Sequence, residues 1–478
     1  MEQKAKTINY KTGCMIAGVL ICLLFSCVIK APQSLEEAAA AAGSSGTLAM
    51  RIFGVTILAI FWWIANVLPD WLTTIAMMLL WILIGGVPFD VAFGSFSSTS
   101  VWIVAGAICF AAAIGKTGLF NRISWFLLKI FPPTFTGQVL ALLLVGAVCS
   151  PMIPSTTAKV VLGTTIATGL ATAMGYEAES PGRYGLFAAS MIGFSNVSPA
   201  FVSASVFGYT LLGALPEGSA QITWGSWFVA MIPWLVIVLA GSFFAIRLLY
   251  RPEEAGSMSK EYAGEQYKKL GQLKGKELLS AVILAGAVAL WILEAKVGIN
   301  AAATAMIATF LCFALGILDF KQLNTAPNWS MFIFLGGVLS LGTVFSRAGI
   351  NAWLQSLLAP LFARLNNPYL VAVIIILTVI LIRFILVSQS ATIIIMLTIL
   401  GPSAASIGLS PFIVGILVYT AELCWFVPYQ NVVYATSMGC TEGKLSHKNT
   451  IKACVAYELL SLAGCLISIP YWVMLGYI

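Results

Sequence analysis

The chain has 478 residues, of which 60% are hydrophobic and only 9% are charged, and its formal net charge is +7. A soluble domain of this size could not bury so much apolar surface, so the composition indicates an all-α polytopic membrane protein. The positive charges gather in a few loops, which is typical of membrane orientation and argues against a nucleic-acid partner. The ten cysteines form no CxxC pair, so neither a disulfide framework nor a zinc site is indicated.

Residues 1–47 are predicted to form an N-terminal helix and a loop outside the cell. Lysines precede an apolar run over residues 13–29, and no small-x-small cleavage site follows it, so we expect a retained helix rather than a signal peptide. Because positively charged flanks stay on the cytoplasmic side, the N-terminus is expected in the cytoplasm. The protein is therefore expected in the inner (plasma) membrane.

The next segment, residues 48–250, is predicted to be the first of two repeats. Its apolar spans are expected at 48–67, 71–88, 98–115, 184–212 and 225–250, with an amphipathic helix at 119–131. Between them, residues 134–174 form two apolar arms around Pro151, Pro154 and three hydroxyl residues. Each arm is shorter than the ~20 residues that a helix needs to cross a bilayer, so we expect a re-entrant hairpin.

Residues 251–277 are predicted to be a cytoplasmic linker, because they belong to a basic cluster that begins at the end of the preceding span. The second repeat follows at 278–478. Its spans are expected at 278–296, 299–318, 328–346, 410–437 and 454–477, with an amphipathic piece at 350–364 and a second hairpin at 368–408. The whole chain is thus predicted to have about eleven transmembrane helices plus two re-entrant hairpins.

Two pairs of short segments recur at nearly the same spacing. Gly118 and Gly349, each at the end of a span, lie 231 residues apart, and Ser155 and Ser388, in the two hairpins, lie 233 residues apart. The first repeat begins outside and the second inside, so the two are predicted to be inverted repeats. Many secondary transporters follow this plan, with the substrate site near the midplane where broken helices meet.

The polar breaks in these helices are the predicted substrate site. Non-helical chain at membrane depth is tolerated only where it lines a cavity or is buried in protein. The candidate substrate-binding residues belong to the two hairpin tips and to the breaks in the spans that follow them: Ser155, Thr156, Thr157, Ser388, Gln389, Ser390, Ser198 and Asn431. The alternative is that their hydroxyl groups bond to their own backbone.

Two cations lie in the apolar arms, Lys159 just after the first tip and Arg383 five residues before Ser388. A charge inside the membrane is costly, so both are predicted to help hold an anion. The alternatives are that Lys159 points along the hairpin toward solvent, and that Arg383 forms a structural ion pair with Glu422 or reaches the surface. Glu422 and Thr392 are the candidate residues for coupling transport to a proton or a sodium ion.

Other charged residues near span ends are expected to be structural. Glu294 is predicted to pair with Lys296, Asp70 and Asp90 to cap helices or face water, and His447 to lie in a loop without a chemical role. With one histidine and no HExxH, the sequence offers little to an enzyme. The absence of a GxxxxGK[ST] loop excludes a primary pump.

At the two tips the sequence resembles the divalent anion/sodium symporter family, which includes bacterial di- and tricarboxylate transporters. That family usually carries Ser-Asn-Thr at each tip, where this chain has Ser-Thr-Thr-Ala at 155–158 and Ser-Gln-Ser-Ala at 388–391. Segments 116–119 and 332–337 also look like family segments, and the resemblance covers residues 48–478. It implies a dimeric, elevator-type carrier of a carboxylate or sulfate-like dianion, either sodium-coupled or a sodium-independent exchanger.

We therefore expect a secondary active transporter of dicarboxylates or tricarboxylates that needs no cofactor. The leading hypothesis is a sodium-independent exchanger or proton-coupled carrier in which Lys159 and Arg383 replace bound cations, since Thr156 and Gln389 stand where the family has asparagines. One alternative is a sodium-coupled symporter of carboxylate or sulfate-like dianions, and another is a sodium/proton antiporter. The candidate sodium positions lie near Ser155, Thr157, Ser388 and Ser390. The expected partners are a small anion, membrane lipid and a second copy of the chain.

Overall fold

The computed structural model describes residues 2–153, 155–216, 219–252, 256, 258–259, 261–325, 329–362, 367–404 and 408–478. The regular secondary structure in these ranges is helical, without a strand, which confirms the predicted all-α class. Seven of the described helices are long and apolar enough to cross a membrane, and five further apolar helices are shorter. The chain is a multi-pass membrane protein, whereas the predicted total number of spans stays a prediction.

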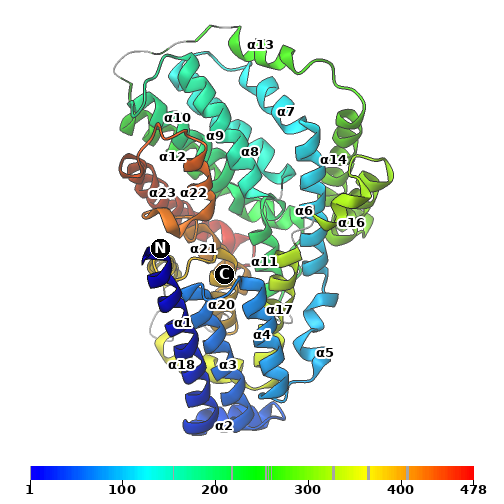
Figure 1. Ribbon diagram of the computed structural model, residues 1–478, viewed down its shortest axis with the longest axis vertical. Helices are drawn as coiled ribbons and strands as arrows, with labels where there is room; N and C mark the ends of the chain where they lie inside the picture. Colours follow the sequence, from blue (N-terminus) through cyan, green and yellow to red (C-terminus); the bar gives the residue numbers. More distant parts are fainter. Residues whose placement is uncertain are drawn as a thin grey trace.

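Twelve α-helices are described up to residue 252. Their bounds are α1 (Glu2–Leu23), α2 (Gln33–Ala41), α3 (Gly46–Ala65), α4 (Asp70–Leu83), α5 (Phe89–Ala92), α6 (Thr99–Thr117), α7 (Leu119–Leu128), α8 (Phe135–Cys149), α9 (Thr156–Ala173), α10 (Pro181–Met191), α11 (Val206–Ala214) and α12 (Trp224–Leu249). In Figure 1, α1, α2, α3 and α4 lie together at the lower end of the molecule, and α8, α9, α10 and α12 lie at the upper end.

The described helices of the rest of the chain begin with a short one in the predicted linker. Their bounds are α13 (Tyr262–Lys269), α14 (Lys276–Ile292), α15 (Glu294–Val297), α16 (Ala301–Ala314), α17 (Trp329–Arg347), α18 (Ile350–Phe362), α19 (Pro368–Ile382), α20 (Gln389–Leu400), α21 (Pro411–Ala421), α22 (Val432–Gly439) and α23 (His447–Met474). Helices α22 and α23 join α10 and α12 in the upper half, while α18 lies in the lower half, where it packs on α2 and contacts α3 (Figure 1).

The two longest described helices, α12 and α23, pack along each other and join the two halves of the chain. Buried indole groups supply polar contacts between them. The Trp472 Nε1–H donates to the Ala230 carbonyl at 2.8 Å, and the Trp234 Nε1–H donates to Ser461 Oγ at 3.2 Å. Because a buried N–H without a partner is costly, these bonds let large aromatic side chains fill the interface at no polar cost.

The first predicted hairpin is a pair of helices, α8 and α9, separated by a break. A 3-10 turn that contains Pro151 follows α8, and Ser155 then caps α9. The Ala158 N–H donates to Ser155 Oγ at 3.3 Å. Proline cannot continue a helix as a donor, and a serine at the N-cap satisfies a free N–H of the next helix. Pro154, predicted to share in this break, lies outside the described residues.

The second predicted hairpin is the helix pair α19 and α20, and it shares a serine N-cap with the first. Ser388 caps α20, because its Oγ accepts a hydrogen bond from the Ala391 N–H at 3.4 Å. Thr392 Oγ1 donates to the Ser388 carbonyl at 2.9 Å. Thr392 therefore bonds to its own backbone, as the alternative interpretation of the hydroxyl residues expects.

The span that follows each hairpin is interrupted, as the polar residues predict. Between α10 and α11 lie a π-helical turn at Ile192–Asn196 and 3-10 turns at Ser198–Ala200 and Val202–Ala204. Between α21 and α22 lies a 3-10 turn at Pro428–Gln430. Asn431 ends this second break as the N-cap of α22. The first interruption is buried inside the protein, where non-helical backbone can find partners. In the second, Gln430 and Asn431 are buried, whereas Pro428 and Tyr429 are exposed.

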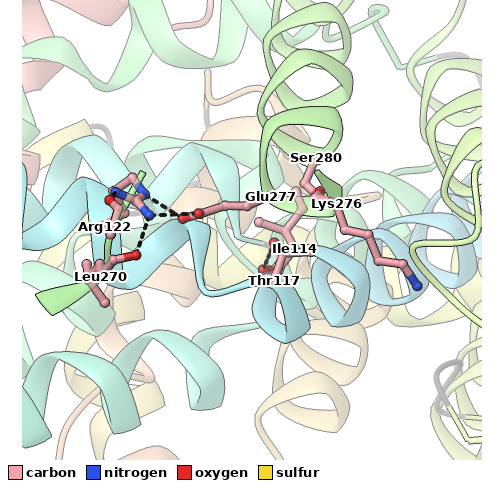
Figure 2. Close-up of polar contacts among 8 residues, drawn as sticks. Ile114, Thr117, Arg122, Leu270, Lys276, Glu277 and Ser280 are labelled. Carbon is pink, nitrogen blue, oxygen red and sulfur yellow. Dashed lines mark hydrogen bonds and ion pairs between the residues drawn. The ribbon is translucent and has the colours of Figure 1, made fainter. Parts of the chain in front are cut away.

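The amphipathic helix α7 is tied to the predicted linker by one buried arginine. Figure 2 shows Arg122 facing Glu277 at the start of α14 and the carbonyl of Leu270 after α13. Arg122 Nε and Nη2 donate to the two Glu277 carboxylate oxygens at 2.7 and 2.8 Å, and Nη1 and Nη2 also donate to the carbonyls of Gly271 and Leu270. The hydrogen bonds to Glu277 raise the pKa of Arg122 above its ordinary value, so the clamp stays charged.

Two minor sequence predictions are wrong. His447 is the first residue of α23, not a loop residue, and its ring bonds to the Tyr434 hydroxyl at 2.8 Å. Glu294 does not pair with Lys296. Its carboxylate instead accepts the backbone N–H of Ala301 at 3.1 Å, because the start of α16 leaves that N–H without a partner inside the helix.

Candidate functional site

A cavity of about 700 Å³ lies between the two hairpin tips, which precede α9 and α20, and the turn that joins α3 to α4. One wall consists of the start of α9, the start of α20, and residues of α11 and α22. The opposite wall consists of the α3–α4 turn and the start of α17. The lining residues are Trp63, Ile64, Asn66, Asp70, Trp71, Thr157, Phe207, Ser330, Met331, Phe334, Val387, Ser388, Gln389, Ser390, Tyr429, Val432 and Val433.

Six of these helices meet the cavity with their N-terminal ends or first turns: α4, α9, α11, α17, α20 and α22. The N-terminus of a helix carries a partial positive charge and unpaired N–H groups, so it favours negative charge nearby. Several such ends directed at one cavity of this size suit a small polar anion. Apolar side chains such as Phe207 and Val433 fill the space between them.

Four of the predicted substrate residues line this cavity. Thr157 comes from the first tip, and Ser388, Gln389 and Ser390 come from the second. The two tips are more than 200 residues apart in the sequence, so the fold brings together the two breaks that the sequence pairs. Hydroxyl and amide groups can donate hydrogen bonds to a carboxylate without bringing a charge of their own.

The other six predicted substrate residues do not line the cavity: Ser155, Thr156, Ser198, Asn431 and the two cations Lys159 and Arg383. Ser155 caps α9, and Thr156 is buried with a hydroxyl that has no hydrogen-bond partner among the described residues. Asn431 caps α22, where its Oδ1 accepts from the Tyr434 N–H at 3.1 Å and its Nδ2 donates to the Leu423 carbonyl at 3.0 Å. The roles of Ser155 and Asn431 in this structure are thus to hold the shape of the breaks.

Lys159 is completely buried behind the first tip. Its Nζ donates to Ser150 Oγ at 3.2 Å, to Ser198 Oγ at 3.1 Å and to the Ala204 carbonyl at 2.8 Å. An ammonium group has three N–H donors, so all of them are used. These oxygens come from the hairpin and from the broken span between α10 and α11, and Lys159 therefore fastens the two breaks together. The alternative in which Lys159 points to solvent is wrong.

Arg383 is completely buried in the corresponding region of the second half. Its guanidinium donates to the carbonyls of Leu386 and Val387, each at 2.6 Å, and to the carbonyl of Gln430. The first two carbonyls belong to the chain just before Ser388, and the third belongs to the break between α21 and α22. Neither Arg383 nor Lys159 is among the residues that line the cavity.

Glu422 is completely buried close to Arg383, but the two side chains form no ion pair within 4.0 Å among the described residues. Neither carboxylate oxygen of Glu422 has a hydrogen-bond partner in the described part of the chain. The structural ion pair considered for Arg383 is therefore replaced by three carbonyl contacts. Glu458 on α23 is a second buried carboxylate without a described hydrogen-bond partner.

The sequence pattern did not single out the opposite wall of the cavity. Asp70 was expected only to cap a helix or face water. It is the first residue of α4, and it also lines the cavity that Ser388 lines. Asn66, in the same turn, has a left-handed backbone with φ of 48°, which turns the chain sharply between α3 and α4. A short Asn-Val-Leu-Pro-Asp connection between two apolar runs was the available signal.

Known proteins similar to this chain are transporters and membrane proteins. A family model described as the sodium:sulfate symporter transmembrane region matches residues 21–478. The inner membrane protein YbhI of Escherichia coli K12 is 25% identical over 79% of this chain and 80% of its own length. The citrate/succinate antiporter of the same strain is 28% identical over 54% of each chain. Dicarboxylate transporter 2 of spinach chloroplasts is 25% identical over 58% of this chain and 51% of its own. Thus the chain spans only about half the length of the last two.

Two solved structures share the fold. The YdaH transporter of Alcanivorax borkumensis superposes with a TM-score of 0.57 and 16% identity, covering 81% of this chain and 88% of its own. MtrF of Neisseria gonorrhoeae gives a TM-score of 0.56 at 13% identity, covering 79% and 82%. At these identities the likeness concerns the fold alone. Since the family model extends over nearly the whole sequence, the chain belongs to the sodium:sulfate symporter family, a family of membrane transporters and not of enzymes.

Proposed function

We propose that the protein is a secondary transporter of dicarboxylates or tricarboxylates that works as a sodium-independent exchanger. The observation that carries this proposal is the environment of Lys159 and Arg383. Each cation is completely buried at a helix break and is held by three oxygen atoms from two breaks. Unwound backbone carbonyls and hydroxyl groups of this kind are what transporters use to bind sodium.

A side-chain cation differs from a bound sodium ion because it cannot leave. It holds the two breaks together in every state and supplies positive charge behind the tips, where an anion needs it. A bound sodium ion is then not needed to hold the two breaks together, and transport has no reason to be coupled to sodium. Moving buried, uncompensated charges past an apolar barrier is costly, so the substrate-free form should not change sides readily. This favours obligatory exchange over net import.

The inverted repeats and the elevator movement belong to the same proposal. The order of helix types is alike in the two halves, with a helix pair, an interrupted span and a long helix in α8–α12 and again in α19–α23. The cavity lies between the breaks of these elements and the α3–α4 turn. A shift of the broken helices against α3, α4 and α17 would carry a substrate held at the tips from one side to the other. A homodimer stays a prediction from the family resemblance.

The substrate class rests on the site and on the relatives together. The cavity is lined by uncharged donors on the side of the tips, and helix N-termini face it, which suits one or more carboxylate groups. Similar proteins are named for dicarboxylates, citrate and succinate. Sulfate-like dianions are the alternative substrates, because the family description names sulfate and sodium.

Glu422 supports a proton-coupled variant of the proposal. Its carboxylate is completely buried, has no described hydrogen-bond partner, and lies near the guanidinium of Arg383. Gln389 of the second tip donates to the Glu422 backbone carbonyl at 3.5 Å, so the residue adjoins the cavity wall. An isolated buried carboxylate is a candidate for carrying a proton during the transport cycle.

Uptake into liposomes tests the proposal. Purified protein is reconstituted into liposomes loaded with unlabelled succinate, citrate or sulfate, and uptake of the labelled anions is followed in sodium buffer and in choline buffer. We expect succinate or citrate to exchange at equal rates in both buffers. Uptake that is abolished in choline and restored by sodium would contradict the exchanger and favour the symporter. Sulfate uptake alone would contradict the substrate class.

A further inference from the structure

The cavity proposed for an anion contains a carboxylate. Asp70 is the only one of its described lining residues that carries an acidic or basic side chain. The two cations of the site lie behind the tips and do not line the cavity, so a bound substrate would meet Asp70 as its nearest exposed charge on the opposite wall. An ionised carboxylate can only accept hydrogen bonds and repels a second carboxylate. The substrate group that faces Asp70 must therefore be a donor.

The position of Asp70 is fixed by its surroundings. It opens α4 directly after Pro69, and its backbone carbonyl accepts hydrogen bonds from Thr74 Oγ1 at 2.8 Å and from Trp63 Nε1 at 3.3 Å. These contacts hold the residue at the cavity wall, which it shares with Ser388 of the second tip. Ser388, which lines the same cavity, has its hydroxyl engaged as the cap of α20.

We infer that Asp70 is a specificity-determining residue that selects dicarboxylates carrying a hydroxyl or ammonium group on the carbon chain. A substituted dicarboxylate directs its carboxylates to the donors of the tips and its hydroxyl or ammonium group to Asp70. An unsubstituted dicarboxylate leaves Asp70 without a donor and near a negative charge. This inference rests on the proposed transport of dicarboxylates.

Helix capping alone does not account for this arrangement. Asp90 lies in the first turn of α5, two residues after Pro88. Its negative charge therefore also stabilises the N-terminus of a helix. Asp90 is exposed and is not among the described residues of the cavity wall. The two aspartates share a local role in the first turn of a helix, and only Asp70 also lines the cavity. Asp90 therefore provides a matched control.

Competition in the liposome assay tests the inference. Exchange of labelled succinate is measured against unlabelled succinate, malate and aspartate, for the wild-type protein, Asp70→Asn and Asp90→Asn. Malate or aspartate should compete at least about tenfold better than succinate in the wild type, because a site built to bond a substrate donor rejects an analogue that lacks it. Asp70→Asn should bring the ratio close to one, and Asp90→Asn should keep it. Malate reports a hydroxyl donor and aspartate an ammonium donor.

The outcomes that overturn the inference differ from those that overturn the proposed function. A wild-type preference for succinate, or a ratio unchanged in Asp70→Asn, overturns the role of Asp70 and leaves the transporter proposal intact. Absence of any dicarboxylate exchange by the wild type overturns both. If Asp70→Asn does not transport, the shift in thermal unfolding midpoint that each substrate produces in detergent gives the same ratio without transport. An equal loss of that shift for all three substrates also contradicts selection by Asp70.

Discussion

The two buried cations occupy equivalent regions but come from opposite arms of their hairpins. At the repeat spacing of 233 residues, Lys159 corresponds to Thr392, and Arg383 corresponds to Ser150. In the first half the lysine stands on the second arm and bonds to Ser150 on the first. In the second half the arginine stands on the first arm, and Thr392 bonds to its own backbone. In this chain, therefore, each half places one buried cation at its breaks, and the two halves supply it from opposite arms.

The two sites also differ in what surrounds the charge. Lys159 bonds to two hydroxyls and one carbonyl, whereas Arg383 bonds to three carbonyls. Glu422 lies near Arg383, and its equivalent in the first half is Ala189, which brings no charge. An ammonium group is a compact charge that accepts varied oxygen partners, while a guanidinium is a rigid fork. We therefore expect the second site to tolerate substitution less well than the first.

The largest effect is expected from Arg383→Met. The change leaves three buried carbonyls without their donor and leaves the Glu422 carboxylate without a nearby cation. Unsatisfied buried groups cost about 1–3 kcal/mol each, so the free energy of unfolding should fall by several such increments. Thermal unfolding in detergent measures the loss. Arg347→Met, at the exposed end of α17, should be close to neutral, and equal stabilities of the two variants would contradict the role of Arg383.

Lys159→Thr places at the first break the residue found at the equivalent position of the second. Sodium-free exchange should fall at least tenfold, because hydrogen bonds to a charged group contribute about 1.5–3 kcal/mol each. Ser150, Ser198 and Ala204 keep their oxygens, so added sodium should restore part of the activity. Lys452→Thr, at an exposed position of α23, is the control. Unchanged sodium-free exchange in Lys159→Thr would show that the first cation is dispensable.

The smallest effect is expected at the Arg122–Glu277 clamp, which has no role at the cavity. Arg122→Ala should lower the free energy of unfolding by about 1–3 kcal/mol, because Glu277 loses a bidentate partner. The double variant Arg122→Glu with Glu277→Arg should recover part of that loss, whereas either single reversal should not. Substrate selectivity should stay the same in all of them. A change in selectivity would place the clamp in the transport mechanism.

The sequence predicted the helix breaks well, because breaks follow from local chemistry. Pro151, Ser155 and Ser388 stop or cap helices by their own conformational preferences, and hydroxyl residues inside apolar runs mark the same points. The spacing of Gly118 and Gly349 then pairs the two halves. These signals lie within a few residues of the structure they determine, so a single sequence is enough to read them.

The partners of the charged groups could not be predicted in the same way. The residues around Lys159 in the sequence do not indicate that it bonds to Ser198 and Ala204. These two residues come close to Lys159 only through the fold of the interrupted span. Asp70 lies more than 300 residues from Ser388, and its place at the cavity depends on how α4 packs. From the neighbouring residues alone, Asp70 is predicted only to stabilise the start of a helix. Its position at the cavity wall follows from the tertiary fold.

The central claim is that permanent cations make the protein a sodium-independent, obligatory exchanger. The most direct measurement is uptake of labelled dicarboxylate in sodium-free buffer by liposomes that are either loaded with unlabelled substrate or empty. The account predicts rapid uptake into loaded liposomes and almost none into empty ones, with no change when sodium is added outside. Uptake into empty liposomes that is driven by an inward sodium gradient would contradict it.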